Sequence, residues 1–232
     1  MNSEIFMDMS VVDDPGVKSI LGKIFSEWHK RKRWDDFPPE IRRAHRHILR
    51  EFLRTGHPPL RASLAALPVP DVNAVLADLC SRDLVVLKED GEIDGAYPFS
   101  GKSTRHTIFI NGNMIAAMCA IDALGSGAMA GQDCAVNSSC PVCKETIRIE
   151  IIKNGLAISD VRPKTAFVWA GVSPTDGGCA ADTQCQSVLM FCSKDHLAQW
   201  RQQHGQNFPG VSLSMAQALQ AGAAIFRPFL KP

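Results

Sequence analysis

The sequence has almost no net charge, no long apolar run and no segment that resembles a secretory leader. Its 232 residues include 25 Lys and Arg against 24 Asp and Glu, which gives a net charge of +1. This balance provides no electrostatic reason to expect binding to nucleic acid or to an acidic membrane surface. No stretch approaches the ~18 consecutive apolar residues of a membrane-spanning helix. The first ten residues are acidic and lack the basic segment of a secretory signal. We therefore expect a cytoplasmic protein with no membrane partner.

Cysteine, by contrast, is well represented. The chain contains eight cysteines, and without a secretory signal these are expected to be reduced thiols rather than a disulfide scaffold. Hydrophobic residues make up 45% of the chain and charged residues 21%, which is ordinary for a globular protein that buries a core as one domain or two. The thiols are therefore the first candidates for chemistry, because thiolates attack electrophiles and bind soft metals.

The first hundred residues predict helices followed by a β-hairpin. Residues 15–34 have apolar side chains at helical spacing, and we place them in an N-terminal helical extension, residues 1–39. Residues 40–103 form the next predicted domain. Its pattern is three helices and a hairpin with an Asp-Gly turn, the order of a winged helix, at residues 40–55, 61–67, 72–83 and 84–97.

The third of these helices would be the one that reads DNA in a winged helix. Asp71 is a good N-cap for it. The segment carries three aspartates against one arginine, namely Asp71, Asp78, Asp83 and Arg82. An excess of carboxylates on this helix would repel the phosphates of DNA. We therefore interpret the winged-helix-like region as a packing module and do not expect DNA as a partner.

Residues 104–232 mix strands and helices without a regular alternation. The predicted strands are 104–111, 133–136, 146–153, 166–170 and 187–191, and the predicted helices are 114–129, 194–204 and 214–226. The chain as a whole is therefore expected to be α+β, with an N-terminal helical, winged-helix-like region followed by a mixed β-sheet domain with helices.

A cysteine and an aspartate stand three residues apart in an apolar segment of this last part. If residues 114–124 are helical, Cys119 and Asp122 lie on one face and can interact. A buried carboxylate is costly unless it is paired or used, and a thiol beside it can pass its proton to it. A further isolated thiol, Cys185, follows 66 positions after Cys119.

Three blocks carry a resemblance to a known family. Residues 111–124 (NGNMIAAMCAIDAL) resemble the alkylmercury (organomercurial) lyase segment that carries the first catalytic cysteine and the aspartate. Residues 136–141 (VNSSCP) resemble the family's Ser-x-Cys segment, and residues 184–193 (QCQSVLMFCS) resemble the segment with the second catalytic cysteine. Order and spacing agree over roughly residues 104–230. The family also has a winged-helix-like N-terminal region, which agrees with the packing interpretation.

The resemblance implies cleavage of a carbon–mercury bond by protonolysis, with Cys119, Cys185 and Asp122 in the catalytic roles. Mercury(II) is a soft cation that thiolates bind well. Two thiolates weaken the carbon–mercury bond, and Asp122 would take a cysteine proton and return it to carbon, which requires burial that favours its protonated form. No cofactor is implied. Cys119 and Cys185 would hold the product Hg(II), with Asp122 nearby, until low-molecular-weight thiols remove it. Mercuric reductase is the implied acceptor.

Cys140 and Cys143 form a Cys-x-x-Cys motif that is half of a zinc site or a redox pair. A closed zinc site needs two more ligands, for which Cys134, Cys179 and His204 stay open. In the resembling family the position of Cys140 is a structural cysteine and Cys143 is an addition. Structural thiols are therefore the favoured interpretation, ahead of metal binding and then redox chemistry.

Four other residues have ordinary interpretations beside more specific ones. Cys179 lies in the glycine-containing loop 173–180 and could pass a metal to or from Cys185, although an exposed thiol without a role is favoured. Cys80 and Cys192 sit in apolar patterns typical of a core. His106 could line a pocket or simply pack within its strand.

Two alternatives to the lyase remain at this stage. The first is a thiol-based soft-metal sensor, but it would need a basic DNA-reading face. The second is a lyase-like protein that binds metal without cleavage, and Asp122 argues against it because binding alone needs no proton donor.

Overall fold

The computed structural model describes residues 7–30, 37–69, 71–171, 179–204 and 209–231. Its helices are α1 (Pro15–Lys30), α2 (Pro39–Thr55), α3 (Val72–Ser81), α4 (Ala120–Ala130), α5 (Lys194–His204) and α6 (Met215–Leu230). Short 3₁₀ helices are η1 (Met9–Val11), η2 (Arg61–Ala66) and η3 (Gln184–Ser187). In the described part of the chain, no helix is both long enough and apolar enough to cross a membrane.

Two antiparallel sheets form the β part of the molecule. The larger has eight strands in the order β1-β2-β3-β5-β4-β6-β7-β8, and the smaller has the order β10-β9-β11. The strands of the larger sheet are β1 (Val85–Leu87), β2 (Ile93–Ala96), β3 (Phe99–Ser100), β4 (His106–Ile110), β5 (Asn113–Ala117), β6 (Cys134–Ser139), β7 (Thr146–Ile152) and β8 (Ala157–Arg162). Those of the smaller are β9 (Phe167–Gly171), β10 (Val188–Phe191) and β11 (Gly210–Ser214). Helices combined with antiparallel sheets confirm the predicted α+β class.

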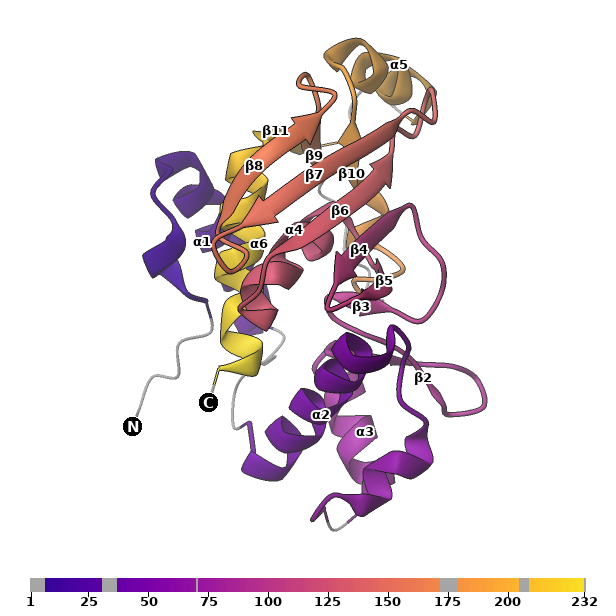
Figure 1. Ribbon diagram of the computed structural model, residues 1–232. Coiled ribbons are helices and arrows are strands. Elements are labelled where there is room, and N and C mark those ends of the chain that lie inside the picture. The colour runs from indigo at the N-terminus through magenta and orange to yellow at the C-terminus, as the bar shows by residue number, and fades with distance from the viewer. Residues whose placement is uncertain (1–6, 31–36, 70, 172–178, 205–208, 232) are drawn as a thin grey trace.

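Helices α4 and α6 lie side by side behind the larger sheet (Figure 1). The two helices lie close together at two glycines, Gly125 of α4 and Gly222 of α6. A Cβ atom added at Gly222 would lie 2.6 Å from the carbonyl oxygen of Ile121, and one added at Gly125 would lie 2.5 Å from the carbonyl oxygen of Gly222. The contact therefore requires glycine on both helices, and it fixes the helix that begins at the candidate site.

The N-terminal elements follow the predicted order of helices and hairpin. Asp71 caps α3 by accepting a hydrogen bond from the backbone N–H of Asn73, as predicted. The hairpin strands β1 and β2 belong to the larger sheet, because β3 joins them to β5 through the Phe99–Ala117 pair. The assignment as a winged helix and the domain boundaries stay predictions, and residues 31–34 of the first predicted helix lie outside the described residues.

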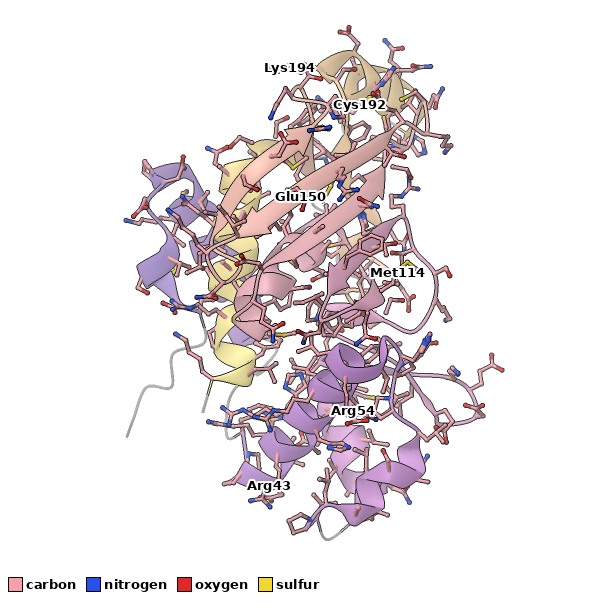
Figure 2. All side chains as sticks on the ribbon, in the orientation of Figure 1. Arg43, Arg54, Met114, Glu150, Cys192 and Lys194 are labelled. Atoms are coloured by element: carbon pink, nitrogen blue, oxygen red, sulfur yellow. The ribbon has the colours of Figure 1, made fainter. Side chains whose placement is uncertain are left out.

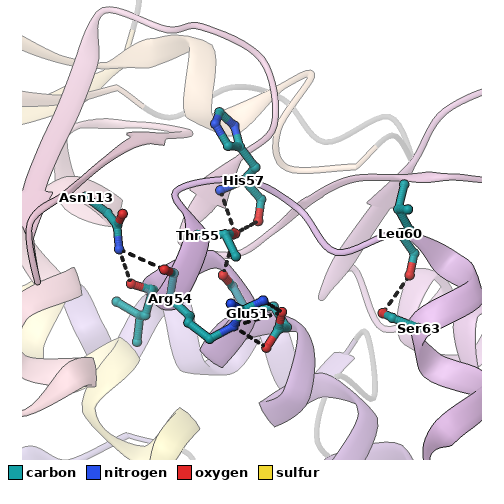
Figure 3. A network of polar contacts seen from close by, with 8 residues as sticks. Glu51, Arg54, Thr55, His57, Leu60, Ser63 and Asn113 are labelled. Atoms are coloured by element: carbon teal, nitrogen blue, oxygen red, sulfur yellow. Dashed lines mark hydrogen bonds and ion pairs between the residues drawn. The ribbon is translucent and has the colours of Figure 1, made fainter.

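The N-terminal part is also tied to the sheet by side chains (Figure 3). Asn113 at the start of β5 donates to the carbonyl oxygens of Leu53 and Arg54, at 2.9 and 3.0 Å. These are carbonyls at the C-terminal end of α2, which lack partners within the helix. Gly56 ends this helix in the left-handed conformation, with φ of 80°. The side chain of Asn113 thus caps the C-terminal end of α2.

The predicted helix 114–129 is wrong in its first turn and a half. Residues Asn113–Ala117 form strand β5, and α4 begins only after Cys119. The turn between β4 and β5 is Asn111-Gly112, with φ of 52° and 73°. Asn-Gly with both residues at positive φ is the preferred two-residue hairpin turn. The apolar run after it pairs with β4 in place of forming a helix, with Ile108 opposite Ile115.

The two-residue strand β3 was not predicted, and two longer strands, β8 and β11, were also missed. Both have mostly half-exposed or exposed side chains, so they lack the alternation of apolar and polar residues that marks a half-buried strand. They form because each pairs with a neighbouring strand through backbone hydrogen bonds: β8 pairs with β7, and β11 pairs with β9.

Candidate functional site

Cys119 sits at the junction of strand β5 and helix α4. It is the N-cap residue of α4, and its Sγ accepts a hydrogen bond from the backbone N–H of Asp122 at 3.4 Å. The thiol is 5% exposed. Because it precedes the helix in place of lying on its face, it reaches Asp122 through capping geometry rather than through the expected helical spacing of three.

Asp122 lies in the first turn of α4 and is 4% exposed. Cys185 comes from η3, in the connection between β9 and β10, and is 7% exposed. Its thiol donates to Oδ2 of Asp122 at 3.6 Å. The Sγ atoms of Cys119 and Cys185 and a carboxylate oxygen of Asp122 all lie within 4.8 Å of one another. The structure therefore brings together the three residues that the sequence singled out, while their catalytic roles stay predictions.

The position of Cys185 is set by a chain of hydrogen bonds to the N-terminal part. Its backbone N–H donates to the carbonyl oxygen of Ala180 at 2.8 Å. The N–H of Ala180 donates to Oδ1 of Asp83 at 3.1 Å, and Tyr97 Oη donates to the same oxygen at 3.2 Å. Asp83 and Tyr97, from the N-terminal part of the chain, thus hold the end of the loop that contains Cys179. Residues 172–178 of that loop lie outside the described residues.

Both thiols of this cluster favour the protonated form. Burial raises the pKa of Cys119, and the charge of Asp122 adds to the increase, against a hydrogen bond with Cys185 that lowers it. The hydrogen bond with Cys119 raises the pKa of Cys185 well above its ordinary value, together with burial and the charge of Asp122. A soft cation must therefore displace protons as it binds, and the carboxylate of Asp122 is an acceptor within reach of Cys185.

Comparison with known proteins places the chain in a family. The family model "Alkylmercury lyase" matches residues 99–227, more than half of the chain. The chain belongs to the alkylmercury lyase family. Curated alkylmercury lyases of Bacillus cereus and Clostridium butyricum are each 29% identical over 161 residues, which is 69% of this chain and 69% of each relative. One from Staphylococcus epidermidis is 28% identical over 162 residues, or 68% of this chain and 72% of the relative.

A solved structure has the same fold. The crystal structure of the mercury-bound form of MerB2 superposes with a TM-score of 0.73 at 22% identity, and the match covers 88% of this chain and 97% of that one. At this identity the likeness supports the fold alone. The family resemblance carried by residues 111–124, 136–141 and 184–193 is confirmed by the family match, which spans all three blocks.

This member of the alkylmercury lyase family has a second thiol cluster. Cys140 and Cys143 lie beside Cys192 and His196, with one ligand atom from each within 4.8 Å of the others. Sequence reasoning interpreted Cys192 only as core and did not consider His196. The signal that could have found both is the Cys-x-x-x-His spacing of residues 192–196, a second half-site for the Cys-x-x-Cys motif.

The remaining candidates lie outside both clusters. His106 is 2% exposed and shares a 2.9 Å hydrogen bond between Nδ1 and Ser138 Oγ, and burial lowers its pKa to about 3, so it packs in its strand as a neutral ring. Burial raises the pKa of Cys134 to about 12, which makes an unreactive thiol. Burial also raises the pKa of Cys80, which is half-buried. Cys179 donates to Asp182 Oδ2 at 3.1 Å.

A surface hollow of about 530 Å³ opens along α2. It is lined by aromatic, proline and arginine side chains, namely Phe37, Pro39, Arg42, Arg43, Arg46 and Arg50. It has neither a thiol nor a carboxylate in its lining, so it lacks the groups that carbon–mercury chemistry needs.

Proposed function

We propose that the protein cleaves the carbon–mercury bond of organomercurials by protonolysis, using Cys119, Cys185 and Asp122. The observation that carries the proposal is the meeting of two thiols and one carboxylate, from separate parts of the chain, within 4.8 Å in a buried place. Burial excludes bulk water, so the proton that reaches carbon comes from a positioned group.

The reaction begins with capture of the substrate by one thiol. An organomercury cation, R–Hg⁺, forms a sulfur–mercury bond as the thiol proton departs. Mercury is soft, and thiolates are the softest ligands that a protein offers. Asp122 accepts a proton at this stage because its Oδ2 already accepts a hydrogen bond from Cys185.

Cleavage follows when both thiols bind mercury, so a second thiol proton is released; it leaves with the anion that accompanied the organomercury cation, because Asp122 already holds the first. The second sulfur–mercury bond raises the electron density on mercury and weakens its bond to carbon. The electron pair of the carbon–mercury bond takes the proton from Asp122, and the products are the hydrocarbon R–H and Hg(II) held by Cys119 and Cys185. Mercury stays in the +2 state throughout, so the step needs no redox cofactor. Exchange with two external thiols restores the two protein thiols and releases Hg(II), which mercuric reductase would then accept.

The test uses the purified protein, an arylmercury compound and excess thiol, with the free arene as readout. We expect stoichiometric arene from the native protein. Asp122→Asn cannot carry a proton but keeps its shape and some hydrogen bonding, so it should bind mercury yet lose roughly 10²–10⁴ in single-turnover rate, the usual worth of acid–base help.

Asp182→Asn is the matched control, because Asp182 is an exposed acid of the segment that holds Cys185 and should tolerate the change. Mercury binding without any arene from the native protein would leave a metal-binding protein of the same fold. Full activity in Asp122→Asn would mean that another group supplies the proton.

A further inference from the structure

The second thiol cluster lies at the far end of strand β10 from Cys185. Cys140 and Cys143 belong to the turn that follows β6, Cys192 follows β10, and His196 is in the first turn of α5. Figure 2 shows Cys192 next to Lys194 at the α5 end of the molecule. Four described residues from two distant chain segments therefore converge outside the candidate active site.

We propose that Cys140, Cys143, Cys192 and His196 form a structural zinc site. Three thiolates and one imidazole are a standard ligand set for a closed tetrahedral Zn(II) site, and the spacings Cys-x-x-Cys and Cys-x-x-x-His match those of structural zinc sites.

The distances within the cluster agree with this geometry. Zn–S bonds of about 2.3 Å and Zn–N bonds of about 2.0 Å place tetrahedral ligand atoms about 3.5–3.8 Å apart. The Sγ atoms of Cys143 and Cys192 are 3.5 Å apart, and Cys140 Sγ is 3.6 Å from Nδ1 of His196. Cys192 Sγ and His196 Nδ1, at 2.9 Å, need to separate by about 0.6 Å to admit the ion.

Local structure aims the first pair of ligands. Pro141 and Val142 make the turn between the two cysteines, and Lys144 after them has a φ of 64° and donates its backbone N–H to the carbonyl oxygen of Cys140 at 3.0 Å. Burial opposes ionisation of Cys140, but backbone N–H groups of Cys192, Cys143 and Val142 face its sulfur and lower its pKa to about 7.

The second pair is held by the entry to α5. The backbone N–H of His196 donates to Ser193 Oγ at 3.3 Å, and Thr165 Oγ1 donates to the carbonyl oxygen of Cys192 at 2.6 Å. Burial and contacts with Cys143, Cys140 and Glu145 raise the pKa of Cys192. Zinc binds cysteine as the thiolate, so zinc uptake should release protons.

A disulfide explains the arrangement less well than a metal ion. The Cys143–Cys192 sulfur separation of 3.5 Å is far from the ~2.05 Å of a disulfide bond. Such a bond would also leave unexplained why Cys140 and His196 lie beside this pair. A zinc ion would use all four groups and would tie the β6–β7 turn to the start of α5, at the end of the strand that leads from Cys185.

The test is the metal content of the purified full chain. We expect one zinc per chain in the native protein and retention in Cys80→Ser, which removes a thiol outside both clusters. The paired change Cys119→Ser with Cys185→Ser should also keep zinc. Cys143→Ser, at an exposed position that should tolerate it, and His196→Ala should each weaken zinc binding by about tenfold or more, as loss of a ligand exceeds the effect of losing a supporting group.

Cobalt substitution of the native protein tests the site without variants, so a variant that fails to fold does not affect the result. Cobalt(II) bound at this site should show the intense visible absorption of a tetrahedral thiolate complex, and zinc should remove it. The proposal is overturned if reduced native protein neither retains zinc nor binds cobalt tetrahedrally. It is also overturned if the paired change Cys119→Ser with Cys185→Ser abolishes zinc binding while Cys143→Ser and His196→Ala retain it. A Cys143–Cys192 disulfide in the native protein would overturn it as well. None of these outcomes bears on arene release, so failure here is distinct from failure of the proposed lyase activity.

Discussion

Cys119 caps helix α4 and also places its thiol in the candidate site. Ser, Thr, Asp and Asn are the residues that cap helices well, since their oxygen accepts from the first backbone N–H groups. A sulfur that accepts from Asp122 N–H at 3.4 Å is a weaker cap. The residue is therefore a poor choice for stability alone, which agrees with a chemical role for it.

This conflict gives a prediction for Cys119→Ser. Serine keeps the cap and improves the acceptor, so the free energy of unfolding should stay within about 1 kcal/mol of the native value or rise, while arene release is abolished. Denaturant unfolding and the single-turnover assay measure the two effects. Cys80→Ser is the control for removal of a thiol and should leave both unchanged. Near-normal turnover in Cys119→Ser would remove this cysteine from the mechanism.

His106 predicts how stability depends on pH. Burial lowers its pKa to about 3 in the folded protein from 6.5, so the unfolded chain binds the additional proton between these values. Stability should be full above pH 6.5 and should fall as the pH drops toward 3, by up to about 1.4 kcal/mol per pH unit from this group.

His106→Gln cannot titrate and keeps a polar group toward Ser138, so its stability should fall less steeply over the same window. His57→Gln, at an exposed position, serves as the control and should follow the native curve. Equal slopes in the native protein and His106→Gln, measured by denaturant unfolding at several pH values, would show that acid destabilisation comes from other groups.

At the scale of elements, the sequence predicts most helices and buried strands but not their junctions. Periodicity locates α2 and α3 closely, because each has an apolar stripe and clear ends, and the predicted bounds of α5, residues 194–204, are also the observed ones. It fails at residues 114–117, where an apolar run suits a helix and a buried strand equally well. The Asn111-Gly112 turn was the local evidence for a hairpin.

The candidate site shows the same limit. The motif around Cys119 and Asp122 could be found from the chain, and the resemblance indicated Cys185, but only the fold brings Cys185 across 66 positions. The second cluster was half visible, as Cys140 and Cys143. Cys192 and His196 were not predicted as ligands. Cys192 follows an apolar strand and has the pattern of a core residue, and His196 lies in an otherwise polar helix.

The contact between α4 and α6 gives a prediction at this scale. Gly222→Ala would place a Cβ atom 2.6 Å from the carbonyl oxygen of Ile121 and 2.9 Å from Cα of Gly125. Relief requires the helices to separate, which should lower the free energy of unfolding by about 1–3 kcal/mol. Because α4 carries Asp122 and begins at Cys119, turnover per folded molecule should fall as well.

Gly22→Ala is the matched control, since Gly22 is an exposed helix residue of α1 with no atom within 4 Å of an added Cβ. Alanine there should raise stability by about 0.5–1 kcal/mol. Thermal or denaturant unfolding compares the two variants. A Gly222→Ala protein as stable as the native one would show that the two helices can separate at no cost.

Across the whole molecule, the N-terminal region supports the site without contributing a reacting group. Asn113 joins the larger sheet to α2, and β1 to β3 extend that sheet. Asp83, just after α3, accepts from Ala180, whose carbonyl in turn accepts from Cys185. The packing interpretation of this region therefore has a specific form: it positions the segment that supplies the second thiol.

Asp83 accordingly gives the last prediction. Its φ is 55°, a conformation that glycine and asparagine adopt readily. Asp83→Gly removes the acceptor without straining the backbone, and it should lower kcat/KM for an arylmercury substrate by about tenfold, since small misplacement of a reacting group is costly. Asp83→Asn keeps an acceptor oxygen and should stay within about twofold of the native value.

Asp78→Ala removes a nearby acid of α3 that pairs with Arg82 and should leave turnover unchanged. Equal activity in Asp83→Gly and Asp83→Asn would show that Cys185 is positioned without help from the N-terminal region. A selective loss in Asp83→Gly, with normal unfolding, would make that region part of the working enzyme.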